Sequence, residues 1–223
     1  MAVEKKENRM FLDKSKSEKW DDIIGDTLVI PIVTIDDTED AVPLAEALVA
    51  GGLPVIEVLL RTDAALEAIE RIATSVREAR VGAGTILYPE QFSQAKEVGA
   101  HFVVSPGAPS ELVSAAMVQS LPWLPGAITP TEIHGLFLKG FTFLKFFPSV
   151  ALGIDYFKEL LGPYQEVSFC PTGGINGSNA AVWLSTPGIR CVGGIWPAPT
   201  ELIRAKKFKT IESLARKAAS LRR

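Results

Sequence analysis

The sequence predicts an α/β fold, a single (β/α)8 TIM barrel that follows an N-terminal helical extension. Short apolar runs alternate with helix-like stretches eight times along the 223 residues. The runs start about 20 to 26 residues apart, which is the length of a strand, a loop, a helix and a second loop. Repeated strand–helix units require parallel strands joined by crossover helices, so eight of them in one chain favour a closed barrel.

The eight apolar runs are the expected strands. An open doubly wound sheet is the alternative, but it usually has fewer strands and carries a glycine-rich turn after its first strand. No such turn follows Ile35, and we therefore expect the barrel. The runs span Leu28–Ile35, Pro54–Arg61, Arg80–Thr85, Phe102–Pro106, Trp123–Ile128, Phe143–Pro148, Ser168–Gly173 and Cys191–Trp196.

Capping signals mark where helices begin between these runs. The segment Thr129-Pro130-Thr131-Glu132 has the pattern of a capping box with proline at the first helical position. Thr62 is predicted to cap the helix that begins at Asp63. We divide the chain into a charged N-terminal extension with a helix, residues 1–24, and a barrel domain, residues 25–223.

Composition and charge limit the partners. Hydrophobic residues make up 47% and charged residues 22%, as in a globular domain, and a net charge of −3 creates no field that attracts nucleic acid. The last 20 residues, 204–223, carry eight Lys or Arg against Glu212. Because apolar residues recur there at spacings of three and four, we expect an amphipathic helix rather than a nucleic-acid tail.

No membrane or secreted location is expected. Two stretches without charge, residues 112–131 and 167–189, contain prolines and glycines that would break a spanning helix. Residues 1–10 lack the apolar region of a signal peptide. We therefore expect Cys170 and Cys191 to be reduced thiols in a cytoplasmic protein.

Lys145 interrupts an apolar run at a position that points inward. Strand alternation puts it on the same face as Phe143 and Phe147. Desolvation there favours the neutral amine, which can attack a carbonyl group and form a Schiff base. A lysine that snorkels from a strand end or pairs with a carboxylate is an equally good interpretation of this run alone.

Glu57 lies in the middle of another apolar run and shares a face with Arg61. Glu57 could form a structural ion pair with Arg61 or Lys145, or act as a general acid/base beside the amine. Arg61, at the carboxyl end of the strand, could bind a substrate carboxylate. Three ionisable groups at inward positions favour the functional interpretation.

Glycine pairs end the last two runs, Gly173-Gly174 and Gly193-Gly194. The loops after the seventh and eighth strands are the usual phosphate site of this barrel, although the glycines could serve tight turns only. His101 and His134 do not lie at metal-ligand spacing with cysteines or carboxylates, so no metal is expected.

Five motifs resemble the 2-keto-3-deoxy-6-phosphogluconate (KDPG) and 4-hydroxy-2-oxoglutarate (KHG) aldolase family. The resemblance extends from about Leu28 to Trp196. The motifs occur together and in the family's order, which makes them specific. They are Glu57-Val58-Leu59-Leu60-Arg61-Thr62, Gly82-Ala83-Gly84-Thr85, Val104-Ser105-Pro106-Gly107, Leu144-Lys145-Phe146-Phe147-Pro148 and Phe169-Cys170-Pro171-Thr172-Gly173-Gly174-Ile175.

The resemblance implies a class I aldolase, a carbon–carbon lyase without metal or cofactor that cleaves KDPG to pyruvate and glyceraldehyde 3-phosphate. Its partners would be a small-molecule substrate and, in a homotrimer, copies of itself. Lys145 would be the Schiff-base lysine and Glu57 the general acid/base. The substrate-binding residues would be Arg61 and Thr85 for the pyruvate carboxylate, Pro106, Phe147 and Thr172 as pocket walls, and Gly173, Gly174, Gly193, Gly194 and Ile195 toward the phosphate.

One position departs from the family pattern. The family loop after the eighth strand usually reads Gly-Gly-Ser, whereas this chain has Ile195 after its glycines. Ile195 keeps the backbone amide but loses a hydroxyl hydrogen bond to the phosphate, worth about 1.5–3 kcal/mol. This favours, as an alternative, cleavage of 4-hydroxy-2-oxoglutarate to pyruvate and glyoxylate. A phosphate-binding barrel isomerase or epimerase and a non-catalytic oligomeric scaffold are further alternatives.

Overall fold

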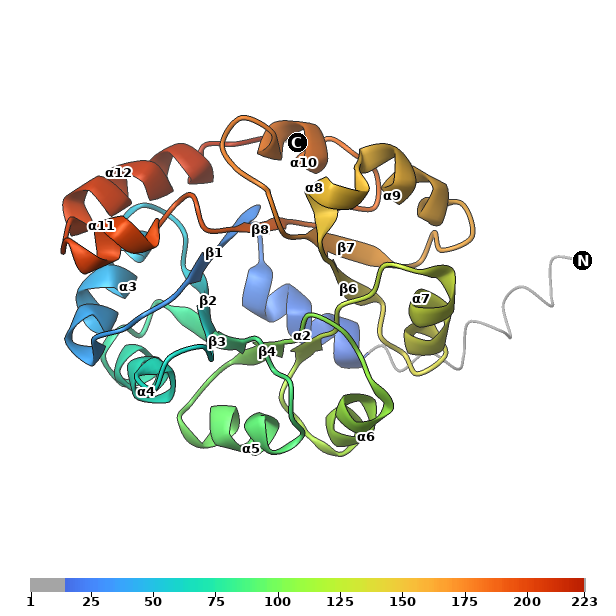
Figure 1. The fold of residues 1–223 in the computed structure, drawn as a ribbon, viewed down its shortest axis with the longest axis horizontal. Helices are drawn as coiled ribbons and strands as arrows, with labels where there is room; N and C mark the ends of the chain where they lie inside the picture. The colour runs from blue at the N-terminus through green and yellow to red at the C-terminus, as the bar shows by residue number, and fades with distance from the viewer. Residues whose placement is uncertain (1–14, 223) are drawn as a thin grey trace, which may run out of the picture.

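Parallel strands alternate with helices through residues 15–222, the part of the chain that the computed structural model describes (Figure 1). Six strands form one curled sheet in the order β5-β4-β3-β2-β1-β8, and β6 pairs with β7 in a second sheet. All of these pairings are parallel, so the predicted α/β class and eight strand positions are confirmed. The strands are β1 (Val29–Val33), β2 (Val55–Leu59), β3 (Arg80–Gly84), β4 (Phe102–Val104), β5 (Trp123–Leu124), β6 (Phe143–Phe146), β7 (Ser168–Pro171) and β8 (Val192–Gly194).

Single bridges join the two sheets where regular pairing stops. Lys145 is bridged to Gly126 just beyond β5, and its N–H donates to Pro125 O at 2.8 Å. On the other side, Thr172 is bridged to Gly193 in β8. Pro125 directly follows the two residues of β5 and has no N–H to donate, which accounts for the short strand at this junction.

Helices surround the strands on the outside (Figure 1). The C-terminal segment forms the predicted amphipathic helix, with Ile211, Ala215 and Ala218 buried. Gly51, at the end of α3, lets the chain approach this helix, because a Cβ there would overlap Ala215. The helices are α2 (Ser15–Ile24), η2 (Thr38–Asp40), α3 (Ala41–Ala50), α4 (Ala65–Ser75), α5 (Glu90–Glu97), α6 (Ser110–Val118), α7 (Pro130–Phe137), α8 (Ser149–Leu152), α9 (Ile154–Leu161), α10 (Ala180–Leu184), α11 (Thr200–Arg204) and α12 (Phe208–Ala219). In the described residues, none of these helices is both long and apolar enough to cross a membrane.

One capping prediction is confirmed and the other is wrong. Thr129 accepts from Glu132 N while the Glu132 side chain accepts from Thr129 N, the two halves of a capping box. The helix after β2 begins at Ala65, and no side chain caps it. Because the helix starts later than predicted, Thr62 lies in the preceding loop, where its hydroxyl donates to Ile35 O at 2.5 Å.

Helix α2 packs across the amino ends of the strands. Trp20 and Ile24 are buried in a cluster that lies inside the curled sheet. The Trp20 ring lies 5.4 Å from that of Phe102 and 5.3 Å from that of Phe143. The charged residues 1–14 of the predicted extension lie outside the described residues. Because α2 covers the amino ends of the strands, the interior of the curled sheet is left open at their carboxyl ends.

Candidate active site

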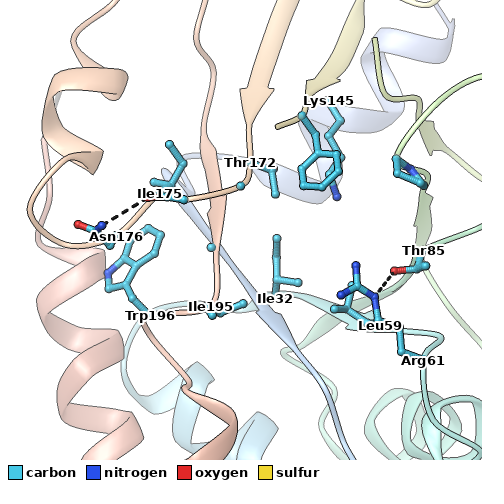
Figure 2. Close-up of a pocket in the computed structure, with 15 residues that line it drawn as sticks. Ile32, Leu59, Arg61, Thr85, Lys145, Thr172, Ile175, Asn176, Ile195 and Trp196 are labelled. Atoms are coloured by element: carbon cyan, nitrogen blue, oxygen red, sulfur yellow. Dashed lines mark hydrogen bonds between the residues drawn. The ribbon is translucent and has the colours of Figure 1, made fainter. Parts of the chain in front are cut away.

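A pocket of about 410 Å³ opens at the carboxyl ends of the strands (Figure 2). The structure brings together in its wall ten of the twelve side chains or glycines predicted for the site. The exceptions are Glu57 and Gly193, which lie just behind the lining. The ten are Arg61, Thr85, Pro106, Lys145, Phe147, Thr172, Gly173, Gly174, Gly194 and Ile195.

The chemical centre is a buried pair between Lys145 of β6 and Glu57 of β2. Lys145 Nζ donates to Glu57 Oε1 at 3.2 Å. Only 8% of the lysine side chain and 4% of the glutamate side chain are exposed. The sequence left the partner of Glu57 open, and the structure assigns it to Lys145. An amine at the pocket with a carboxylate as its hydrogen-bond partner is an arrangement that can activate a nucleophile.

The neighbouring strand leaves room for this pair only because it ends in glycine. A Cβ on Gly84 would lie 2.7 Å from Glu57 Cγ and 2.8 Å from Leu59 Cδ2, and closer still to the carboxylate. Any larger residue at position 84 would therefore move the glutamate. The Phe147 ring closes another side, with its centroid 5.6 Å from Lys145 Nζ.

Arg61 faces Lys145 across the pocket (Figure 2). Its Nε donates to Thr85 Oγ1 at 3.0 Å, which leaves the rest of the guanidinium directed toward the pocket. Thr85 has a φ of 62°, in the left-handed region that costs a non-glycine residue roughly 1–2 kcal/mol. The backbone thus bears strain where it turns the threonine hydroxyl toward the arginine.

The glycine loops after β7 and β8 form the opposite side of the pocket. Gly174 has a φ of 79°, and a Cβ on it would lie 2.7 Å from Val150. Within the described residues, the backbone N–H groups of Gly174 and Ile195 donate no hydrogen bond, so both are available to an anion. Gly193 lies behind Thr172, where a Cβ would come 2.8 Å from the threonine hydroxyl.

Five further residues line the pocket that the sequence patterns did not indicate. Ile32 and Leu59 could have been found, because Leu59 shares the inward face of Glu57 and Arg61 under strand alternation. The other three lie in loops, where no periodicity gives a direction. They are Ile175, Asn176 and Trp196.

The pocket combines an amine, a carboxylate behind its wall and a guanidinium. Among the described residues, no group of three His, Cys, Asp or Glu side chains is placed to hold a metal ion. A buried amine with a proton acceptor beside it, and a cation across the pocket to bind a carboxylate, are the groups needed for imine chemistry on a keto acid. With this fold, they point to an enzyme of the Schiff-base class.

Comparison with known proteins gives the family. The KDPG and KHG aldolase model matches residues 21–214. A 2-dehydro-3-deoxy-phosphogluconate aldolase of Pseudoalteromonas atlantica is 40% identical over 200 residues, covering 89% of this chain and 93% of that protein. The chain therefore belongs to the KDPG/KHG aldolase family, and the resemblance found in the sequence is confirmed.

Solved structures agree with this assignment. One is KDPG aldolase from Legionella pneumophila with pyruvate captured at low pH as a covalent carbinolamine intermediate; its TM-score is 0.86 at 39% identity, covering 89% of this chain and 97% of that one. Another is the Zymomonas mobilis ZM4 aldolase with 3-phosphoglycerate, with a TM-score of 0.84 at 42% identity, covering 91% and 96%.

Proposed function

We propose that this protein is a class I aldolase that cleaves KDPG to pyruvate and glyceraldehyde 3-phosphate without metal or cofactor. One observation carries the proposal, the 3.2 Å contact between Lys145 Nζ and Glu57 Oε1 at a pocket that both the amine and Arg61 line. The covalent pyruvate intermediate in the Legionella pneumophila relative supports the same chemistry.

Lys145 and Glu57 carry the reaction. Glu57 takes a proton from Lys145, whose amine attacks the keto carbon of the substrate. Glu57 then gives that proton to the carbinolamine hydroxyl, which leaves as water, so that an iminium forms and Glu57 is a carboxylate again. Glu57 then removes the proton of the C4 hydroxyl, the C3–C4 bond breaks, and its electron pair flows into the iminium to form an enamine. Glu57 returns the proton to C3, and water hydrolyses the imine to free pyruvate and the amine.

The other site residues bind the substrate. Arg61 holds the pyruvate carboxylate together with the Thr85 hydroxyl to which it is hydrogen-bonded. Pro106, Phe147 and Thr172 form the walls around the reacting carbons. Their place in the lining beside Lys145 supports these roles.

The glycine loops bind the phosphate. The residues are Gly173, Gly174, Gly193, Gly194 and Ile195, and the unengaged N–H groups of Gly174 and Ile195 support this role. One observation favours a second candidate, cleavage of 4-hydroxy-2-oxoglutarate. Ile195 presents a hydrocarbon side chain, 60% exposed, where a phosphate-binding hydroxyl would stand in the family pattern.

We extend the proposal to the whole assembly. The bridges on both sides of β6 and β7 support a closed (β/α)8 barrel. We divide the chain into the extension of residues 1–24, whose helix α2 covers the amino end of the barrel, and the aldolase domain of residues 25–223. We propose a homotrimer in the cytoplasm, and light scattering tests the trimer directly.

Pyruvate release tests the function. KDPG and 4-hydroxy-2-oxoglutarate are supplied separately, and pyruvate is measured by coupling to lactate dehydrogenase. We expect both to be cleaved, and Glu57→Gln to lower kcat by about 10²–10⁴. Glu46→Gln, the same change on the exposed face of α3, is the control and should have no effect. Folded protein that releases no pyruvate from either substrate would favour the isomerase or the scaffold.

A further inference from the structure

The end of the pocket away from Arg61 is lined by hydrocarbon. Ile175, Ile195 and Trp196 gather there, and Ile32 lies between them and Arg61 (Figure 2). No side chain that lines this end carries a charge. Ile195 is 60% exposed, so its side chain offers hydrocarbon surface to a molecule bound at this end. This is the end where the aldehyde half of the substrate must lie, because Arg61 occupies the carboxylate end.

The Trp196 ring is held as a fixed wall. It lies directly over Gly194, where a Cβ would overlap the ring, and a Cβ on Gly177 would touch its five-membered edge at 3.7 Å. Two glycines therefore leave the space that the ring fills. A ring fixed in this way contributes apolar area without the entropy cost of ordering a mobile side chain.

Asn176, which also lines this end, is hydrogen-bonded within its own loop. Its Oδ1 accepts from Ser178 N at 2.9 Å and from Ser178 Oγ at 2.6 Å. Its Nδ2 donates to Gly174 O at 3.4 Å. The donors left for a charged aldehyde at this end are uncharged N–H groups, whereas an apolar chain finds a preformed surface.

We propose that this enzyme also uses unphosphorylated straight-chain aliphatic aldehydes, whose tails lie against Ile195 and Trp196. The inference rests on the proposed function and deepens it. In the synthetic direction the enamine carbon of bound pyruvate attacks the aldehyde carbon, and the new alkoxide takes a proton from Glu57. Water then hydrolyses the imine and releases a 4-hydroxy-2-oxo acid, so the reaction needs no oxidant or further reactant.

A chain-length series tests the proposal. Pyruvate is combined in turn with ethanal, propanal, butanal and glyceraldehyde 3-phosphate, and each product is measured by mass spectrometry. Each methylene that enters an apolar site is worth about fourfold, so kcat/KM should rise about fourfold from ethanal to propanal and again to butanal.

Variants locate the effect. Ile195→Ser should abolish the increase of kcat/KM with chain length among the aliphatic aldehydes. It should also raise kcat/KM for glyceraldehyde 3-phosphate about tenfold, because it replaces a hydrocarbon side chain with a hydroxyl donor. Val182→Ser is the matched control, since Val182 is 59% exposed on α10 but does not line the pocket. It should leave every rate unchanged.

The failure of this proposal can be told apart from the failure of the aldolase mechanism. Borohydride reduction with pyruvate alone reports the imine without any aldehyde. If the adduct forms but kcat/KM does not change along the aldehyde series, the apolar subsite is refuted and the aldolase mechanism stands. The same holds if Ile195→Ser lowers kcat/KM equally for all aldehydes. If no adduct forms on folded protein, both proposals are refuted.

Discussion

Gly84→Ala should disable the site through a single added methyl group. Ordinary contacts begin at 3.4 Å, and this methyl would lie 2.7 Å from Glu57 Cγ. Glu57 must therefore move by about 0.7 Å or more. Its carboxylate is already 3.2 Å from Lys145 Nζ, so such a movement breaks or misaligns the contact. Misplacement by about 1 Å costs on the order of 10² in rate, and we expect kcat to fall by about that factor.

The same substitution two residues earlier gives the control. A Cβ on Gly82 would lie 2.5 Å from Phe102 Cζ, and the three atoms nearest to it all belong to that ring rather than to Glu57. Overpacking costs about 1–3 kcal/mol in either variant, so both should unfold at a lower temperature. Only Gly84→Ala should lose kcat per folded molecule.

Thermal unfolding and steady-state pyruvate release separate the two effects. Both variants are assayed well below their Tm, with the folded fraction measured by circular dichroism. Normal kcat in folded Gly84→Ala, or an equal loss of kcat in Gly82→Ala, would refute the reasoning that Glu57 must stand where the structure has it.

Three further predictions concern Thr62 beside Arg61, the cap of α7 and the histidine before β4. Thr62→Val removes the hydroxyl that anchors the loop directly after Arg61, so KM should rise about two- to tenfold in steady-state assays while kcat stays nearly unchanged. Thr62→Ser, which keeps a hydroxyl, should restore the original KM. A fall in kcat as large as the rise in KM would contradict a positioning role for Thr62. Thr129→Ala breaks the capping box and should cost about 0.5–2 kcal/mol in denaturant unfolding without changing kcat. Burial lowers the pKa of His101 in the folded protein below its ordinary value of 6.5. As the pH falls, the unfolded chain therefore protonates His101 at a higher pH than the folded protein does, and the free energy of unfolding should fall below about pH 6.5. His101→Gln should reduce that slope when unfolding is measured at several pH values.

Much of the fold could be predicted because local sequence patterns indicate where each strand and helix lies. Each expected run contains an observed strand, since apolar runs separated by helix-length segments leave few other arrangements. The packing of α2 could not be predicted in this way. Trp20 and Ile24 lie in a charged segment of the sequence. Only the arrangement of the strands shows that these two side chains fill the space at the amino ends of the strands.

The site was predicted to different depths for different residues. Strand alternation puts Lys145 and Glu57 on inward faces, but it gives no distance between side chains of β6 and β2. Only the structure could therefore show that Glu57 pairs with Lys145. Thr62 was misassigned because a hydroxyl before a helix serves equally well as a cap or as a donor to a neighbouring loop. Trp196 was missed because a loop has no period.

Borohydride trapping tests the central claim, that Lys145 forms an imine with pyruvate. The protein is incubated with pyruvate, reduced, and analysed by intact mass and peptide mapping. We expect one reduced adduct on the peptide that contains Lys145. We expect no adduct in Lys145→Arg and a normal adduct in Lys158→Arg, where the lysine is exposed. Folded protein without an adduct, or with its adduct on another lysine, would contradict the account.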